Sequence, residues 1–281
     1  MKSGLTFSTA IALVFLAVVV VLVAVTPFLP GYDPFGQNLA AGLLPPGGRS
    51  FDGAFYLLGT DTLGRDMLSR LALAGQVSLL IGFGAVVTSL IIGTALGLVA
   101  GFFKGWTENV IMGLADLQLS IPRVLLLISV AAIVTPGVIN LALLLGVTSW
   151  VSYGRVARAM TLSLREREFV LAATTQGATA AWNIRKHLLP NVMPQMLIIG
   201  SYELAQIIVM EASLSYLGLG VQPPLPSWGT MVSDGQTYLE LAPWLVVLPS
   251  VALFLLIAGV QFLSQAFTPE SDGTAEAMRT A

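Results

Sequence analysis

Four ionisable side chains stand inside long apolar stretches of this 281-residue chain, and they are the residues best suited to chemistry. Asp116 and Arg123 are seven residues apart, so a helix would place them on one face across two turns. Glu203 and Glu211 are eight residues apart, about 80° around a helix, and can share a broad face. Charges within a membrane face protein or water, so they predict ion pairing, solute binding or gating.

Each of these charges has a functional and a structural interpretation. Glu203 lies roughly 16 Å from the inner end of its apolar stretch, at 1.5 Å per helical residue. It is expected to line a pathway and attract a cationic group such as an amino terminus, or else to be a structural acid bonded to a neighbouring helix. Glu211 is expected to have a structural or gating role near the outer mouth. Arg123 is expected to pair with Asp116 or with an acid on a partner subunit.

Catalytic and metal-binding sets are missing from the sequence. The chain has no cysteine and one histidine, His187, which excludes thiolate sites, disulfides and multi-histidine metal sites. None of its three lysines follows a glycine, so the Gly-Lys-Ser/Thr end of a phosphate-binding loop is absent. The net charge of −2 excludes nucleic-acid binding through phosphate neutralisation. We therefore expect neither a membrane enzyme nor a cofactor bound by this chain.

The elements that must position these charges are transmembrane helices. Hydrophobic residues make up 56% of the chain and charged residues 10%, against about 25% charged in a typical soluble domain. A helix needs about 20 apolar residues to cross the hydrocarbon core. The fold class is therefore an all-α polytopic membrane protein with about six transmembrane helices. We expect them near residues 7–29, 76–102, 110–134 with a break or bend at Pro122, 138–153, 192–216 and 243–266.

Basic residues predict the orientation, because cytoplasmic loops carry an excess of Lys and Arg. With both termini in the cytoplasm, only Arg49, Arg65 and Arg70 lie outside, Arg123 lies in the membrane, and the other basic residues lie inside. We accordingly divide the chain into an N-terminal transmembrane helix (1–30), an extracytoplasmic segment of loops and short helices (31–75), a core membrane domain (76–267) and a cytoplasmic tail (268–281).

The inner loop, residues 155–191, is long, basic and patterned. Residues 163–176 are dominated by helix formers, and Gly177 supplies the left-handed residue that ends a helix. Thr179 is expected to cap a second short helix over 180–188, which Pro190 ends. The result is a helical elbow beneath the membrane with little bulk at its tip. The alternative is an amphipathic connector that rests on lipid headgroups.

The elbow resembles the cytoplasmic signature loop of ATP-binding-cassette importer permeases. That pattern is Glu-Ala-Ala, three residues, Gly, nine residues, Ile, one residue, Leu-Pro, and it is matched here by Ala172, Ala173, Gly177, Leu189 and Pro190.

Two positions depart from the pattern. Leu171 stands at the glutamate position and His187 at the isoleucine position. Glu168, about one helical turn earlier, is a candidate to supply the acid instead.

Two further segments are similar to the dipeptide, oligopeptide and nickel branch of that family. Residues 58–66 (Leu-Gly-Thr-Asp-Thr-Leu-Gly-Arg-Asp) resemble its entry into the second helix, and residues 211–224 with Pro-Ser-Trp-Gly at 226–229 resemble the exit of its fifth. The likeness runs over residues 57–267 and best fits the second, C-type permease subunit. It implies the type I importer permease (MetI-like) architecture in a bacterial inner membrane.

The resemblance also implies partners. A second, homologous permease would complete the pathway, two cytoplasmic ATPases carrying ATP and Mg would bind the elbows, and an extracytoplasmic binding protein would deliver di- or oligopeptides. Basic side chains of the elbow could instead contact anionic membrane lipid. Nickel, glutathione and opines stay open as substrates. A proton-coupled secondary transporter is the alternative of a different class, and an exporter is disfavoured because the elbow pattern belongs to importers.

Overall fold

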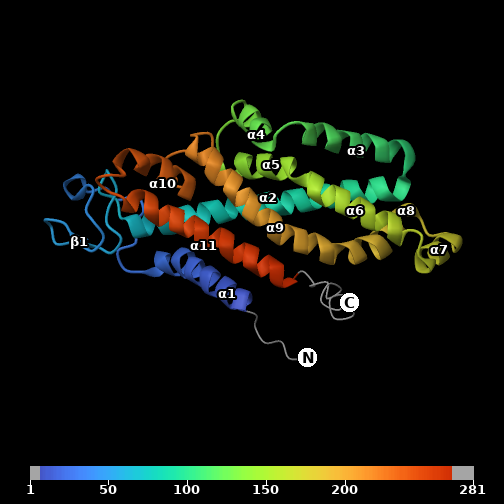
Figure 1. Cartoon of the computed structure of the whole chain (residues 1–281), viewed down its shortest axis with the longest axis horizontal. Helices are drawn as coiled ribbons and strands as arrows, with labels where there is room; N and C mark the ends of the chain where they lie inside the picture. Colours follow the sequence, from blue (N-terminus) through green and yellow to red (C-terminus); the bar gives the residue numbers. More distant parts are fainter. Residues whose placement is uncertain (1–6, 268–281) are drawn as a thin grey trace, which may run out of the picture.

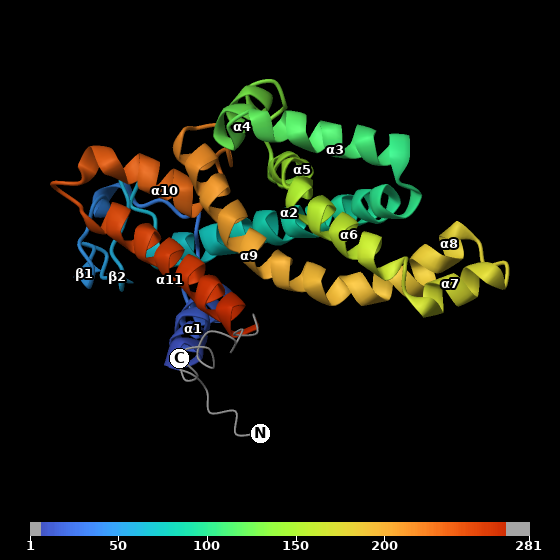
Figure 2. The same cartoon turned by 45° about the vertical axis from the view of Figure 1, so that its right-hand side comes forward.

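The computed structural model describes residues 7–267 and is an elongated assembly of helices (Figure 1). Its longer helices lie side by side, with the loops and short strands that precede residue 67 at one end and a small helical elbow at the other (Figure 2). The elements are α1 (Phe7–Val20), η1 (Val21–Val25), η2 (Thr26–Phe28), η3 (Leu39–Ala41), β1 (Gly48–Arg49), β2 (Phe55–Tyr56), α2 (Met67–Phe103), α3 (Gly105–Ser120), α4 (Arg123–Ala131), α5 (Val138–Thr148), α6 (Trp150–Leu164), α7 (Glu168–Thr175), α8 (Ala180–Asn183), η4 (Ile184–Leu188), α9 (Leu189–Tyr216), α10 (Trp228–Gly235), η5 (Gln236–Tyr238) and α11 (Trp244–Phe267).

Four helices of the described chain are long and apolar enough to cross a membrane, against the six expected. They cover Thr9–Phe28, Met67–Phe103, Ala180–Tyr216 and Trp244–Ser264. The expected bend at Pro122 is confirmed: α3 and α4 meet there at 90° and make a fifth span if they are counted as one. A proline has no N–H for the helical ladder, so the chain turns at this point.

The fourth expected helix is where the sequence prediction was least accurate. It is divided at Ser149 into α5 and α6, of 11 and 15 residues, and neither is long enough to span alone. It also continues to Leu164 instead of ending near Tyr153. The extension is stabilised because Arg155 and Arg158 pair with acids on α3.

Helix α2 is the central element, 37 residues long and therefore about 55 Å from end to end. It begins at Met67, nine residues before the expected start at 76, because the Asp66 carboxylate accepts a hydrogen bond from the Ser69 N–H at 2.8 Å and caps the helix. The expected boundary between the outer segment and the core domain at residue 75 thus falls inside this helix. A Cβ on Gly97 would lie 2.6 Å from that of Ala157, so small residues allow α2 and α6 to pack closely.

The outer segments fold against the ends of the long helices. Strands β1 and β2 form one short antiparallel pair, with Gly48 opposite Tyr56. Helix α10 carries a capping box at Ser227, and Trp228 is fully buried with its indole N–H donating to the Leu71 carbonyl at 3.0 Å. Helix α1 packs along α11. The expected cytoplasmic tail, 268–281, lies outside the described residues.

Candidate functional site

The elbow between α6 and α9 has the two caps that the local sequence predicts, but its first helix is shorter than the expected 163–176: α6 runs to Leu164, and α7 begins at Glu168. Gly177 has φ of +88°, the left-handed conformation expected of a helix-ending glycine. The N–H of Ala178 donates to the Ala173 carbonyl at 3.0 Å, which closes α7. The Thr179 hydroxyl accepts from the Trp182 N–H at 3.3 Å and caps α8. A Cβ on Gly177 would meet nothing within 4 Å, so the tip is open to another surface.

The expectation that Pro190 ends the second helix was wrong. Helix α8 runs through the π-helical turn η4 into α9, so that residues Ala180–Tyr216 form one continuous helix. Pro190 lies in the first turn of α9 after the π turn, where a missing N–H costs little. The Asn191 side-chain amide donates to the His187 carbonyl at 2.6 Å. The elbow is therefore a direct extension of a membrane-spanning helix.

Buried side chains fasten the elbow to the membrane helices. Val170 of α7 and Leu188 of η4 are buried in one cluster with Leu98 of α2 and Tyr153 of α6. The Asn183 amide donates to the Thr174 hydroxyl at 3.1 Å and ties the two arms together. A displacement of the elbow would reach α2, α6 and α9, because close-packed side chains transmit movement.

The remaining signature-loop residues lie on or beside the exposed face of the elbow. Glu168 occupies the first turn of α7, where a negative charge is favoured by the helix dipole. Leu171, at the motif's glutamate position, is 52% exposed. Ala172 is exposed, while Ala173 and Leu189 are partly buried. The elbow therefore offers a surface of small and apolar side chains bordered by one acid.

Aromatic packing around His187 is a feature that sequence reasoning missed. Its ring lies 4.8 Å from the Trp182 ring and 5.6 Å from the Phe169 ring, measured between centroids, both edge-on. Two aromatic rings thus pack against the histidine that stands at the isoleucine position. The available signal was the occurrence of Phe169 and Trp182 on the same loop as His187 in the sequence.

Basic residues of the loop divide into two groups. Arg165 donates to the carbonyl of Phe102 at 2.5 Å, and so satisfies the C-terminal end of α2. Lys104 pairs with Glu166 at 3.2 Å. A second group is exposed and is suited to a partner protein or to lipid headgroups: Arg167, Arg185 and Lys186.

The intramembrane charges pair differently from the intrahelical expectation. Asp116 lies 2.5 Å from Arg155 of α6, and Arg123 lies 3.8 Å from Glu203 of α9. The expected Asp116–Arg123 pair does not form in this structure because the 90° bend falls between the two residues and ends their common helical face. Within the described chain Arg123 pairs with Glu203, and an acid on another subunit as a further partner stays a prediction.

Glu203 and Glu211 lie against different neighbours. Glu211 is 0% exposed and accepts hydrogen bonds from Ser78 at 3.0 Å and Ser215 at 2.7 Å, which fits the structural interpretation. Glu203 is 4% exposed, and its Oε2 has no hydrogen-bond partner within the described chain. Arg123 Nε and the Tyr153 hydroxyl are likewise buried without a partner there. The pathway role of Glu203 stays a prediction.

Comparison with known proteins identifies what this arrangement resembles. Residues 93–271 match the family model described as the binding-protein-dependent transport system inner membrane component. A di/tripeptide transport system permease protein of Pseudomonas aeruginosa is 38% identical over 89% of this chain and 83% of its own length. A dipeptide permease of Haemophilus influenzae is 34% identical over 95% and 88%, and a glutathione permease of Pectobacterium atrosepticum is 35% identical over 74% and 69%.

The fold is similar to that of a solved importer. An inward-facing structure of the MetNI methionine ABC transporter aligns with a TM-score of 0.56 at 18% identity, over 72% of this chain and 98% of that chain. A second crystal form of the same transporter aligns with a TM-score of 0.53. At this identity the likeness concerns the fold, and it matches the expected type I permease architecture.

Proposed function

Because this chain belongs to the family of binding-protein-dependent transport system inner membrane components, we propose that it forms half of the translocation pathway of an ATP-driven importer. A second, homologous permease supplies the other half, and an extracytoplasmic binding protein delivers the solute. The observation that carries this proposal is the elbow, whose exposed tip continues directly into the spanning helix Ala180–Tyr216.

The elbow is proposed to couple the pathway to two cytoplasmic ATPases. ATP and Mg bind to those partners and not to this chain. ATP binds the closed ATPase pair better than the open one, and this difference in affinity drives the change of state. The contact surface comprises Glu168, Leu171, Ala172, Ala173 and Gly177. Leu189 and Pro190 join it to α9, so a push on the elbow becomes a rigid-body movement of the helices.

Di- or oligopeptides are the proposed substrates. The names of several relatives support this class, and the glutathione permease supports a related one. Nickel and opine transport remain alternatives within the same family. Proton-coupled secondary transport is the alternative of another class, and ATP dependence separates it from the proposal.

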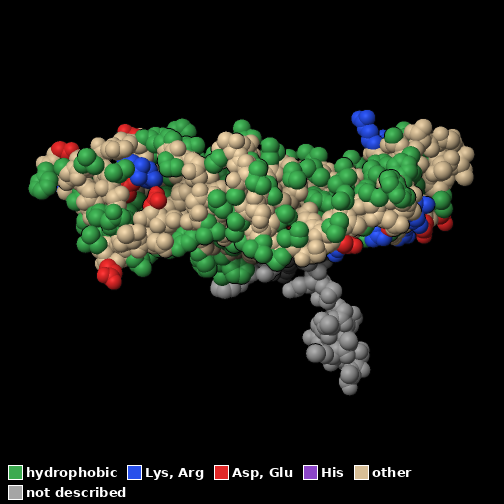
Figure 3. Space-filling model, turned by 90° about the horizontal axis from the view of Figure 1, so that it is seen from above, with side chains coloured by type: hydrophobic (Ala, Val, Ile, Leu, Met, Phe, Trp, Pro, Cys, Tyr) green, Lys and Arg blue, Asp and Glu red, His purple; other side chains and the backbone are tan. Residues whose placement is uncertain are grey.

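The proposed location is a bacterial inner membrane, with both termini and the elbow in the cytoplasm. Basic side chains gather around the elbow end of the molecule, and a smaller group lies toward the opposite end (Figure 3). The exposed Arg167, Arg185 and Lys186 belong to the elbow group. This distribution supports the orientation because Lys and Arg concentrate on the cytoplasmic side.

The test is uptake by the importer assembled from its permeases, ATPases and binding protein in sealed proteoliposomes. We expect accumulation of a radiolabelled dipeptide that requires ATP on the face of the membrane that corresponds to the cytoplasm. This accumulation should persist when an ionophore collapses the proton gradient. Loss of uptake on collapse of the gradient, with ATP still present, would favour the secondary mechanism. Competition by unlabelled glutathione or nickel separates the substrate alternatives.

A further inference from the structure

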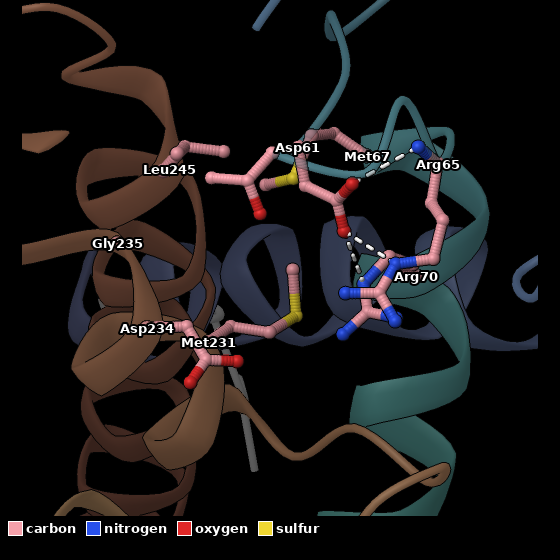
Figure 4. A pocket seen from close by; sticks show the side chains of 9 residues that line it. Asp61, Arg65, Met67, Arg70, Met231, Asp234, Gly235 and Leu245 are labelled. Carbon is pink, nitrogen blue, oxygen red and sulfur yellow. Dashed lines mark hydrogen bonds and ion pairs between the residues drawn. The ribbon is translucent and has the colours of Figure 1, made fainter. Parts of the chain in front are cut away.

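A charged cavity (Figure 4) lies beside α10 and the start of α2, at the end of the molecule opposite the elbow (Figure 1). Its volume is about 210 Å³, and it is enclosed by the segment before α2, the first turn of α2, and helices α10 and α11. The side chains that matter most for its chemistry are Asp61, Arg65, Arg70, Met231, Asp234 and Leu245. Two cationic and two anionic groups thus meet in a space partly walled by apolar side chains.

Asp61 has no capacity left for a further donor. Its Oδ1 accepts from the N–H groups of Leu63 at 2.9 Å and Arg65 at 3.0 Å. Its Oδ2 accepts from the Nε of Arg65 at 2.6 Å and lies 3.3 Å from the Nε of Arg70. A carboxylate offers about four acceptor positions: three are filled by these hydrogen bonds, and the fourth lies beside Arg70. One negative charge therefore serves two guanidinium groups.

Arg70 lines this cavity and is left with an unsatisfied donor. The residue is 5% exposed, and its Nη1 has no hydrogen-bond partner in the described chain. Arg65 lies close enough to repel it. A buried cationic donor without a partner is costly, so such a site favours an incoming acceptor with negative charge.

Asp234 on α10 lowers the cost of the Arg70 charge through space, but it does not pair with it. It forms no ion pair with Arg65 or Arg70 among the residues that the structure describes, and Figure 4 shows it across the cavity from them. Partial burial raises the pKa of Asp234 above its ordinary value, and the charges of Arg70 and Arg65 counteract only part of that rise. A second cavity of about 200 Å³ shares Arg65, Arg70 and Asp234 and extends to the proline-rich turn at 222–226.

We propose that Arg70, together with Arg65, binds a carboxylate in this outer cavity. The guanidinium fork matches the planar pair of carboxylate oxygens, and the first cavity has room for a small group of that kind but not for a large solute. The carboxylate comes either from a small free molecule or from an acidic side chain of the extracytoplasmic binding protein. Asp234 opposes the incoming charge and so limits the affinity.

The test uses the full chain in lipid nanodiscs and [1-¹³C]acetate, with binding measured by the line width of the acetate carbon at fixed ionic strength. Asp234→Asn removes the opposing charge and is expected to tighten acetate binding roughly three- to tenfold. Glu240→Gln is the matched control, because it removes an exposed acid near α10 that does not line the cavity. Arg70→Gln is expected to abolish binding.

A second arm identifies the source of the carboxylate. If acetate does not saturate the wild type, the affinity of the binding protein for the assembled importer is measured with the same variants. If Asp234→Asn raises the affinity for the binding protein in that arm and Glu240→Gln does not change it, the carboxylate comes from an acidic side chain of the binding protein. The proposal is overturned if the two variants behave alike in both arms, or if chloride competes as well as acetate. None of these outcomes depends on transport.

Discussion

The guanidinium of Arg123 lies 3.8 Å from the carboxylate of Glu203, and this pair joins the short helix α4 to the long helix α9. The Glu203 side chain is almost fully buried, whereas that of Arg123 is 30% exposed. A hydrogen bond of 2.5 Å from Arg123 to the Ser149 hydroxyl also reaches the junction of α5 and α6. One arginine thus connects three helical segments inside the membrane domain.

Removing one partner of this pair should destabilise the protein more than removing both. Glu203→Gln leaves Arg123 partly buried without its counter-charge, and we expect a loss of about 1–3 kcal/mol in the free energy of unfolding. The double variant Arg123→Gln/Glu203→Gln should recover part of that loss. Thermal unfolding of the four proteins in detergent gives the coupling energy, and strictly additive effects would show that the pair is not coupled.

The pathway role of Glu203 is a separate prediction with its own readout. If its carboxylate attracts a cationic group of the solute, Glu203→Gln should lower uptake of a lysine-containing dipeptide more than that of dialanine. Glu211→Gln serves as the matched control, because that acid is bonded to Ser78 and Ser215. Equal uptake of both peptides by wild type and Glu203→Gln would leave Glu203 a structural acid.

Glu211 should tolerate an amide far better than an apolar side chain. Glu211→Gln keeps an acceptor oxygen for one of the two serine hydroxyls and offers its NH2 as a donor to the other, whereas Glu211→Leu leaves both without a partner. We expect Glu211→Leu to cost about 1–3 kcal/mol more than Glu211→Gln. Chemical or thermal unfolding measures the difference, and equal stability of the two variants would contradict the assigned hydrogen bonds.

Two substitutions at Gly177, in the tip of the elbow, distinguish the effect of backbone strain from the effect of blocked docking. Gly177→Ala adds a Cβ to a left-handed residue and should cost about 1–2 kcal/mol without obstructing a partner. Gly177→Trp adds the same strain together with a large ring. We expect the tryptophan variant to lose ATPase co-purification and uptake while the alanine variant retains both. If the two variants lose function equally, strain and not contact explains the effect.

The orientation of the chain can be read by cysteine labelling, since the sequence has no cysteine of its own. Phe51 is 100% exposed in the outer segment, and Gln176 is exposed in the elbow. In intact spheroplasts, a membrane-impermeant maleimide should label Phe51→Cys and not Gln176→Cys. In inside-out vesicles the pattern should reverse. Labelling of both positions from one side would refute the proposed topology.

Local sequence determined those parts of the protein that depend on neighbouring residues. The apolar composition predicted a helical membrane protein, because backbone hydrogen bonds must be satisfied within the chain inside lipid. Pro122 predicted a bend, because proline has no N–H to donate to the helix. Gly177 and Thr179 predicted the two caps of the elbow because capping depends on residues within one turn. The spacing of the signature loop and the sequence segments 58–66 and 211–229 indicated the family.

Tertiary structure decided which distant groups meet. Arg123 lies beside Glu203 and not beside Asp116, because a 90° bend redirects its helix toward α9. Pro190 lies within a continuous helix because a π-helical turn comes directly before it, and its missing N–H is tolerated at that point. Arg70 lacks a full partner because it shares the Oδ2 of Asp61 with Arg65. Helical periodicity fixes a side chain's direction on its own helix, but only packing between helices fixes what it faces.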